Sequence, residues 1–215
     1  VSLLPSAGPL VVDELRLLGC HVSLSSPLTA GAMLVERALV SISSTAPIDV
    51  SANLTLVKSN VATNAPVHSR HLNVDDGSLM SKVAASPPLT LSVGSLVMAG
   101  TIRGPAVLIS CAQRLELQGS GSIVASFLGQ PSAGGSGAGG TPASGNSGAG
   151  GGGAHGGGGG DGARSSVSHA GSYGDFTLPR TAGSGGGRGL FSYSTSRYYQ
   201  DGGAGGGIIE LNVTG

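Results

Sequence analysis

Residues 94–126, which read GSLVMAGTIRGPAVLISCAQRLELQGSGSIVAS, decide the fold of this chain. Runs of small and β-branched residues, such as AVLI at 106–109 and IVA at 123–125, alternate with short turns built from Gly, Pro and Ser. The runs are not joined by Asn-Gly or Asp-Gly, the pairs that mark tight hairpins. Short strands without hairpin turns favour a parallel β-helix, in which each coil buries small aliphatic side chains and stacks on its neighbours.

The same pattern recurs within this stretch and upstream of it. Alternation with a period of two places every second side chain on one face, so each run is predicted to be a strand. The further candidates are 15–17, 22–24, 39–42, 54–57, 89–93, 96–98 and 115–117. Residues 58–86 lack the pattern and are interpreted as an excursion loop. Because the spacing of the runs is not constant, an irregular β-sandwich is the alternative fold.

Composition excludes several classes of protein. The 215 residues carry 11 Lys and Arg against 11 Asp and Glu, and only 10% of them are charged. We therefore expect no nucleic-acid partner. The sequence contains no run of 18 apolar residues, so we also expect no membrane span. Aromatic residues make up 3% without Trp, which argues against an aromatic-centred core. Hydrophobic residues at 39% are too many for a charged, disordered chain.

Glycine divides the chain into two parts. Residues 1–128 hold nine of the 40 glycines, and residues 129–215 hold the other 31. A tract of this composition is by default a flexible linker, but chains without Cβ atoms can also approach until their main-chain groups pair. We expect an all-β protein, with an irregular parallel β-helix-like coil over 1–128. A packed glycine-rich extended region would follow over 129–215, with a closing strand at 207–214.

Ordered motifs in the glycine-rich part carry a resemblance to a known family. GAHGG at 153–157, YGD at 173–175, Pro179, GSGGG at 183–187 and GAGGGIIEL at 203–211 follow GSIVA at 121–125. Their order resembles that of large glycine-rich eukaryotic cell-surface or extracellular proteins. The resemblance covers about residues 90–215 and implies a right-handed parallel β-helix of pectin-lyase-like character, outside the cell and within a long chain. The Tyr/Arg-bearing segment at 190–200 departs from the family's pattern.

Two further features bear on the location of the protein. Asn53 and Asn212 each begin an Asn-x-Thr sequon, so both are candidate glycosylation sites if their side chains point outward. Cys20 and Cys111 lack the spacing of a metal site and are interpreted as a disulfide or as two buried thiols. The disulfide is favoured because the other features indicate an extracellular or cell-surface location.

No cofactor, metal or catalytic site is predicted. Residues 156–163 fit a calcium-binding nonapeptide with Asp161 as ligand, but any polyglycine run satisfies that pattern and true repeats occur in tandem. His155 is expected to hydrogen-bond a carbonyl within the glycine packing. The adjacent acids at 13–14 and 75–76 would point to opposite faces of a strand, and strings resembling GxSxG follow from the abundance of Gly and Ser.

Residues 188–199 concentrate aromatic and Arg side chains. Four of the seven aromatic residues lie in this segment, and such clusters are typical of contact surfaces. The candidate interface residues are Arg188, Phe191, Tyr193, Arg197, Tyr198 and Tyr199. The alternative is a cap that shields the end of the glycine-rich packing.

These features together indicate a non-catalytic structural subunit of an extracellular or cell-surface assembly. Low charge and stacked strands suit self-association into a polymer, such as a glycosylated filament or stalk. A carbohydrate-binding adhesin or surface-recognition module that uses the Tyr-rich segment is the alternative. An ice-binding protein is a weaker alternative, because regular Thr-x-Thr ladders are missing.

Overall fold

The structure, a computed structural model, is all-β. It describes residues 2–3, 8–82, 88–126, 128–142, 148–155, 161, 172–175, 180–193 and 196–215. Within these residues every regular element is a strand. The chain divides into two compact units, which we describe separately: Val1–Val124 with Ile209–Gly215, and Ala125–Ile208.

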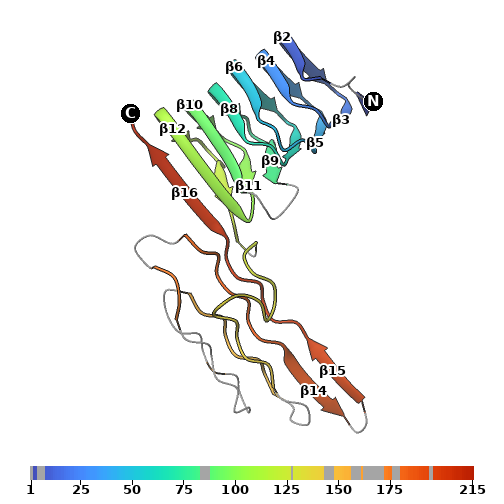
Figure 1. Cartoon of the computed structure of the whole chain (residues 1–215), viewed down its shortest axis with the longest axis vertical. Coiled ribbons are helices and arrows are strands. Elements are labelled where there is room, and N and C mark those ends of the chain that lie inside the picture. Colours follow the sequence, from blue (N-terminus) through green and yellow to red (C-terminus); the bar gives the residue numbers. More distant parts are fainter. Residues whose placement is uncertain are drawn as a thin grey trace. The chain divides into compact units, whose positions relative to one another are not determined.

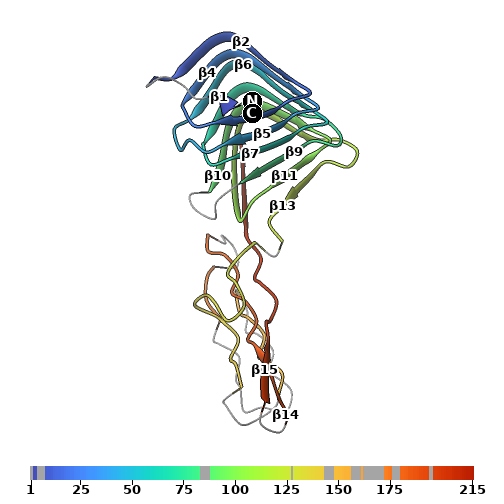
Figure 2. The same ribbon diagram turned by 90° about the vertical axis from the view of Figure 1, so that its right-hand side faces the viewer.

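The first unit is a parallel β-solenoid of about six turns (Figures 1 and 2). Short strands form one seven-stranded sheet, in the order β1 (Ser2–Leu3), β3 (His21–Leu24), β5 (Leu39–Ile42), β7 (Asn60–Thr63), β9 (Leu79–Lys82), β11 (Thr101–Arg103) and β13 (Ser122–Val124). Mostly longer strands form the second sheet, in the order β16 (Ile208–Val213), β12 (Ala106–Leu117), β10 (Leu89–Met98), β8 (Val67–Val74), β6 (Ile48–Val57), β4 (Leu28–Glu36) and β2 (Leu10–Leu18). Each coil therefore contributes one strand to each sheet.

The register shows how successive coils stack. Leu15 pairs with Met33, and Met33 pairs in turn with Leu54, so register partners are separated by one full coil of sequence. The strand pairs from β2–β4 to β10–β12, and from β1–β3 to β11–β13, are all parallel. The predicted β-helix-like fold is thus confirmed, and the alternative β-sandwich is not present. The apolar runs are unevenly spaced in the sequence because the coils differ in length.

The long strands change direction midway, at a position we call the corner. Register shifts mark it between Ala30 and Met33, between Val50 and Asn53, and between Val93 and Ser95. Glycine occupies the corner in β4 and β10, because a Cβ on Gly31 or Gly94 would collide with a carbonyl of the neighbouring coil. The strands predicted separately at 89–93 and 96–98 are consequently one strand, β10, bent at Gly94.

The corner also explains why residues 58–86 were misjudged. The excursion loop predicted there is wrong, because β7, β8 and β9 occupy most of this stretch, while residues 83–87 lie outside the described part. In β8 the buried residues are Val67 and Ser69 before the corner and Leu72 and Val74 after it. The extra residue shifts the inward face by one position, so an uninterrupted period of two is lost.

The core consists of apolar ladders that run through the stack. Leu17, Val35, Leu56, Val74 and Met98 are register partners from coil to coil, and each is at most 6% exposed. A second ladder contains Met33, Leu54, Leu72 and Leu96. Because each coil buries aliphatic side chains against the next, the solenoid has a continuous core that needs no large aromatic residues.

The predicted closing strand at 207–214 is present as β16, but it belongs to the first unit. It lies beside β12 and runs in the opposite direction (Figure 1). The Thr214 amide donates to the Cys111 carbonyl oxygen at 3.1 Å. The boundary between the units near residue 124 lies close to the predicted boundary at 128, whereas the C-terminal strand returns to the solenoid.

The second unit is held together by backbone hydrogen bonds between glycine-rich segments. Residues 183–190 bond to three other segments: Gly139 N donates to Gly185 O at 3.1 Å, Gly187 N to Gly151 O at 2.8 Å and Gly186 N to Gly203 O at 2.8 Å. A strand in a flat sheet has two neighbours, so these segments do not form a single flat sheet, and we call them the glycine-rich bundle. In the same unit β14 (Gly189–Tyr193) and β15 (Ser196–Gln200) form an antiparallel hairpin.

Close approach between main chains explains the glycine content of this bundle. A Cβ on Gly139, Gly185, Gly187 or Gly205 would lie well inside van der Waals contact with a backbone carbonyl of a neighbouring segment. By contrast, a Cβ on Gly203 or Gly206 would meet no atom within 4 Å. The glycines are therefore not equivalent, and only those at close approaches are sterically required.

Candidate functional site

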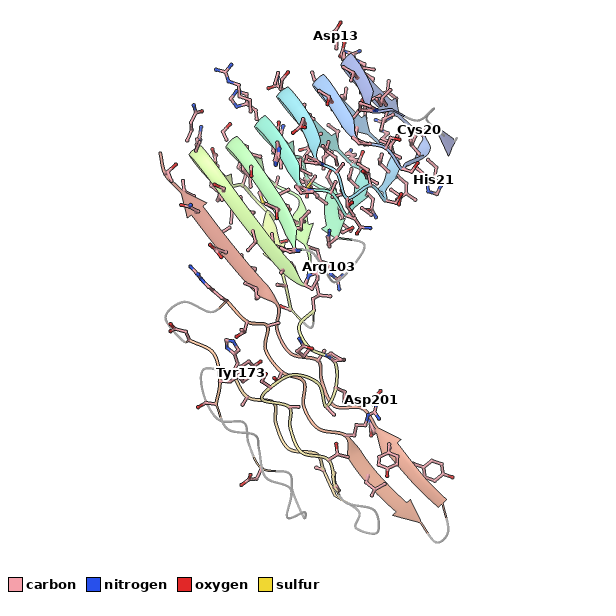
Figure 3. All side chains as sticks on the ribbon, in the orientation of Figure 1. Asp13, Cys20, His21, Arg103, Tyr173 and Asp201 are labelled. Carbon is pink, nitrogen blue, oxygen red and sulfur yellow. The ribbon has the colours of Figure 1, made fainter. Side chains whose placement is uncertain are left out.

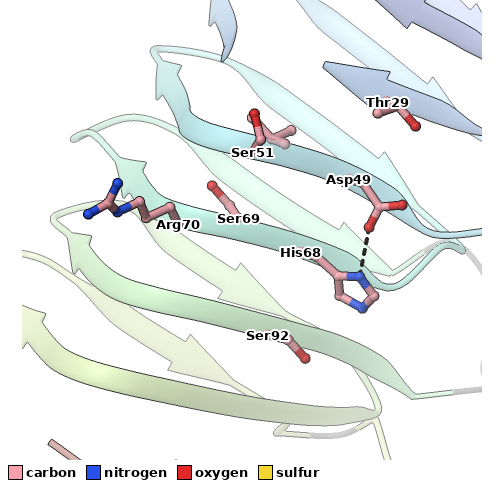
Figure 4. A pocket seen from close by; sticks show the side chains of 8 residues that line it. Thr29, Asp49, Ser51, His68, Ser69, Arg70 and Ser92 are labelled. Carbon is pink, nitrogen blue, oxygen red and sulfur yellow. Dashed lines mark hydrogen bonds and ion pairs between the residues drawn. The ribbon is translucent and has the colours of Figure 1, made fainter. Parts of the chain in front are cut away.

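A shallow depression of about 300 Å³ lies on the outer face of the longer-stranded sheet. Seven of its eight lining residues are of polar types, and they come from β4, β6, β8 and β10 (Figure 4). The residues that line it are Thr29, Asp49, Val50, Ser51, His68, Ser69, Arg70 and Ser92. Because the strands are in register, Thr29, Asp49, His68 and Ser92 form one ladder across four successive coils.

The centre of this ladder is an ion-pair-like contact. The Nδ1 atom of His68 lies 2.8 Å from the Oδ1 atom of Asp49, and their side chains are 44% and 51% exposed. An ionised carboxylate can only accept hydrogen bonds, so Nδ1 must carry the proton. In the neutral imidazole Nε2 is then the atom with the free lone pair, and the ring is held in one tautomer.

Ser92 and Arg70 also line the depression. Ser92 is the register partner of His68 in β10, on the side of His68 opposite to Asp49 (Figure 4). Arg70 follows His68 by two residues in β8 and is exposed at the corner. Nearby, His71 Nδ1 lies 2.6 Å from the Ser95 hydroxyl. The site thus combines an oriented imidazole, hydroxyl groups and one guanidinium.

The predicted glycosylation sites are both accessible. Asn53 lies in β6 just after the corner, and Asn212 lies in β16; both residues are exposed. Thr214 is exposed as well, and Thr55 is partly buried. The condition that the Asn side chains point outward is therefore met at both positions.

The two cysteines are free thiols in the structure. Cys20 follows β2 at the first described coil (Figure 3), whereas Cys111 lies in β12. These strands are five steps apart in the sheet, which corresponds to roughly 24 Å. The distance is far beyond the reach of a disulfide within one chain. The favoured disulfide is therefore wrong, and the alternative of two separate thiols holds in the structure. Cys111 is buried, and Cys20 is partly buried.

The predicted Tyr/Arg interface maps to the β14–β15 hairpin and its base. Tyr198 and Tyr199 are 62% and 55% exposed, and Arg188 forms an ion pair with Asp201 at 2.8 Å (Figure 3 labels Asp201). The side chains of Phe191, Tyr193 and Arg197 lie outside the described part of the chain, although their backbones pair in the hairpin. The hairpin therefore presents at least two large aromatic side chains to solvent.

His155 and Lys82 are two further ionisable residues with partners in the structure. His155 Nε2 lies 3.1 Å from the Thr181 hydroxyl, and its ring meets Tyr173 edge to face at 5.0 Å. The described partner of Nε2 is thus a side-chain hydroxyl. Most of the calcium-like stretch at 156–163 lies outside the described residues. Burial lowers the pKa of Lys82, whose ammonium donates to the Asn64 carbonyl at 2.6 Å.

Among the described residues, no group of three or more His, Cys, Asp or Glu side chains is placed to hold a metal ion. The same part of the chain contains no helix that is long and apolar enough to cross a membrane. No family model, curated protein or solved structure matches this chain.

Sequence reasoning missed the Asp49–His68–Ser92 ladder. His68 follows Asp49 by 19 positions, and Ser92 follows His68 by 24 positions. Neither separation is distinctive in the sequence. Both separations equal the length of the intervening coil, as the register pairs show. The signal becomes visible only when the register of the solenoid is known.

Proposed function

We propose that this chain is a structural unit of an extracellular or cell-surface assembly, in which the solenoid acts as a glycan-bearing stalk segment. The observation that carries the proposal is the exposure of both sequon asparagines on strands of the solenoid. N-linked sugar is added only in the secretory pathway, so two accessible acceptors fit a secreted chain. The resemblance to glycine-rich eukaryotic surface proteins points the same way.

Exposed apolar side chains on the outermost strands support self-association. In the described sheet, β2 and β16 are the edges. Val11 and Leu18 of β2 are 67% and 54% exposed, and Leu211 and Val213 of β16 are 47% and 48% exposed. Edge strands with apolar side chains favour pairing with another chain. Contact between unlike edges of two copies would extend the stack into a filament.

The test is to express the chain through a eukaryotic secretory pathway and measure intact mass and sedimentation. We expect added mass that a glycosidase removes, with Asn53→Gln and Asn212→Gln each abolishing one increment. We also expect species larger than a monomer, visible as fibres by electron microscopy. The double variant Val11→Asp/Leu18→Asp should shift the larger species to monomer. The variant Tyr198→Ala tests instead whether the hairpin is the contact surface. Bare asparagines on a strictly monomeric chain would contradict the proposal.

A carbohydrate-binding role is the second candidate, and the exposure of Tyr198 and Tyr199 favours it. Successive residues of a strand point to opposite faces, so the hairpin presents one tyrosine on each side. Amphipathic aromatic rings of this kind are common in recognition surfaces. If the protein binds a glycan array and Tyr198→Ala abolishes this binding, the result would support a recognition role of the hairpin over a structural one.

A further inference from the structure

The ladder in the depression has the order of groups found in nucleophilic hydrolases. A carboxylate contacts Nδ1 of an imidazole, and a serine lies on the other side of that imidazole, one strand further on. Three groups in this relation activate a hydroxyl: the imidazole removes its proton, and the carboxylate orients the ring and stabilises its charged form. The arrangement is recognised by geometry and not by its position in a sequence.

We infer that Asp49, His68 and Ser92 form an acyl-transfer site, with a carboxylic ester as the class of substrate. The inference goes beyond the structural role proposed above and does not rest on it. Ser92 would be the nucleophile, His68 the general base and then the general acid, and Asp49 the positioning residue. From the sequence we expected no catalytic residue, and this inference differs from that expectation.

The contacts in the structure support each role. The 2.8 Å contact with Asp49 places the proton on Nδ1 and leaves the Nε2 lone pair available. Parallel neighbours in register are about 4.8 Å apart, so a rotation of the exposed Ser92 side chain brings its hydroxyl towards the ring. All three side chains line the same open depression, which gives an ester access to them.

Arg70 is the cationic residue of the depression, and its side chain extends away from His68 and Ser92 in the structure (Figure 4). It lines the same depression on the same strand as His68. Its guanidinium is a fixed positive charge at any physiological pH. If the Arg70 side chain turned towards Ser92, its guanidinium would stabilise the negative charge that develops on the ester carbonyl oxygen as the hydroxyl attacks.

The reaction balances without a cofactor. As the Ser92 oxygen bonds to the ester carbonyl carbon, the hydroxyl proton moves to His68 Nε2. The bond to the alcohol then breaks, and the alcohol oxygen takes that proton. Water next gives a proton to Nε2 while its oxygen attacks the acyl-serine carbon. The carboxylic acid leaves, and the Ser92 oxygen regains its proton.

The test uses an alkyl fluorophosphonate, read by intact mass and peptide mapping, together with hydrolysis of p-nitrophenyl acetate. With the fluorophosphonate, a bond from Ser92 oxygen to phosphorus forms, the phosphorus–fluorine bond breaks, and hydrogen fluoride is released. We expect one label on Ser92, and ester hydrolysis about 100-fold slower in Ser92→Ala, the low end for base catalysis because the site is exposed.

Ser110→Ala is the matched control, because Ser110 is the next residue of the same ladder and lies one strand further from His68. We expect it to leave labelling and hydrolysis unchanged, and His68→Gln and Asp49→Asn to slow both. Circular dichroism checks that each variant is folded. An unlabelled wild-type protein, a label elsewhere, or a Ser92 label that persists at the same rate in His68→Gln would overturn the inference. Each outcome is read on single chains, so it is independent of the test of assembly.

Discussion

Replacing Leu96 with alanine is expected to lower the free energy of unfolding of the solenoid by roughly 2–5 kcal/mol. Leu96 is fully buried in β10 and packs in a ladder between Leu72 and the partly buried Leu115. Its removal leaves a cavity in the middle of the stack, where coils on both sides resist collapse. The loss is a large part of the roughly 5–15 kcal/mol that stabilises a typical domain.

Leu18→Ala is the matched control, because the same side chain is 54% exposed at the outermost strand β2. We expect a change within about 0.5 kcal/mol there. Urea unfolding followed by circular dichroism measures both variants on the same scale. Equal effects at the two positions would show that Leu96 does not lie in a closely packed core.

Gly205→Ala is expected to open the glycine-rich bundle, at a cost of roughly 1–3 kcal/mol from steric overpacking. Gly205 is buried, its amide donates to the Gln130 carbonyl, and its carbonyl accepts from the Gly129 amide, both at 2.9 Å. A Cβ at this position would collide with the carbonyl of Gly183. The methyl group can be accommodated only by moving a neighbouring segment, which breaks these bonds.

The adjacent Gly206→Ala is the control, since a Cβ there meets no atom within 4 Å and φ is not positive. Hydrogen exchange of the amides at 129–140 and 183–207 is the measurement. We expect loss of protection in Gly205→Ala and wild-type protection in Gly206→Ala. Matching behaviour of the two variants would instead support the flexible linker that this composition usually predicts.

Much of the solenoid was predictable because apolar alternation is a local property. The runs at 22–24 and 39–42 coincide with β3 and β5 almost residue for residue. Where the strand passes the corner, an extra residue reverses the inward parity, and β8 therefore escaped recognition. Local patterns predict straight segments well, but a bend is fixed by contacts with the neighbouring coils.

The candidate site was less predictable than the fold. The contact between His68 and Asp49 depends on which residues face each other in adjacent coils, and that register depends on coil lengths that differ from one turn to the next. The cysteine assignment failed for the same reason. The features that indicated an extracellular location favoured a disulfide, but only the order of strands shows that Cys20 and Cys111 are too far apart.

Cysteine cross-linking tests the stacked parallel register most directly. Asn73 of β8 and Val97 of β10 are register partners in neighbouring coils. In a Cys20→Ser/Cys111→Ser background, Asn73→Cys with Val97→Cys should form a disulfide, because neighbouring parallel strands are about 4.8 Å apart. Asn73→Cys with Glu116→Cys spans two steps and should remain reduced. Oxidation of the first pair alone is the predicted result, and oxidation of the second pair instead, or of neither, would contradict the parallel solenoid.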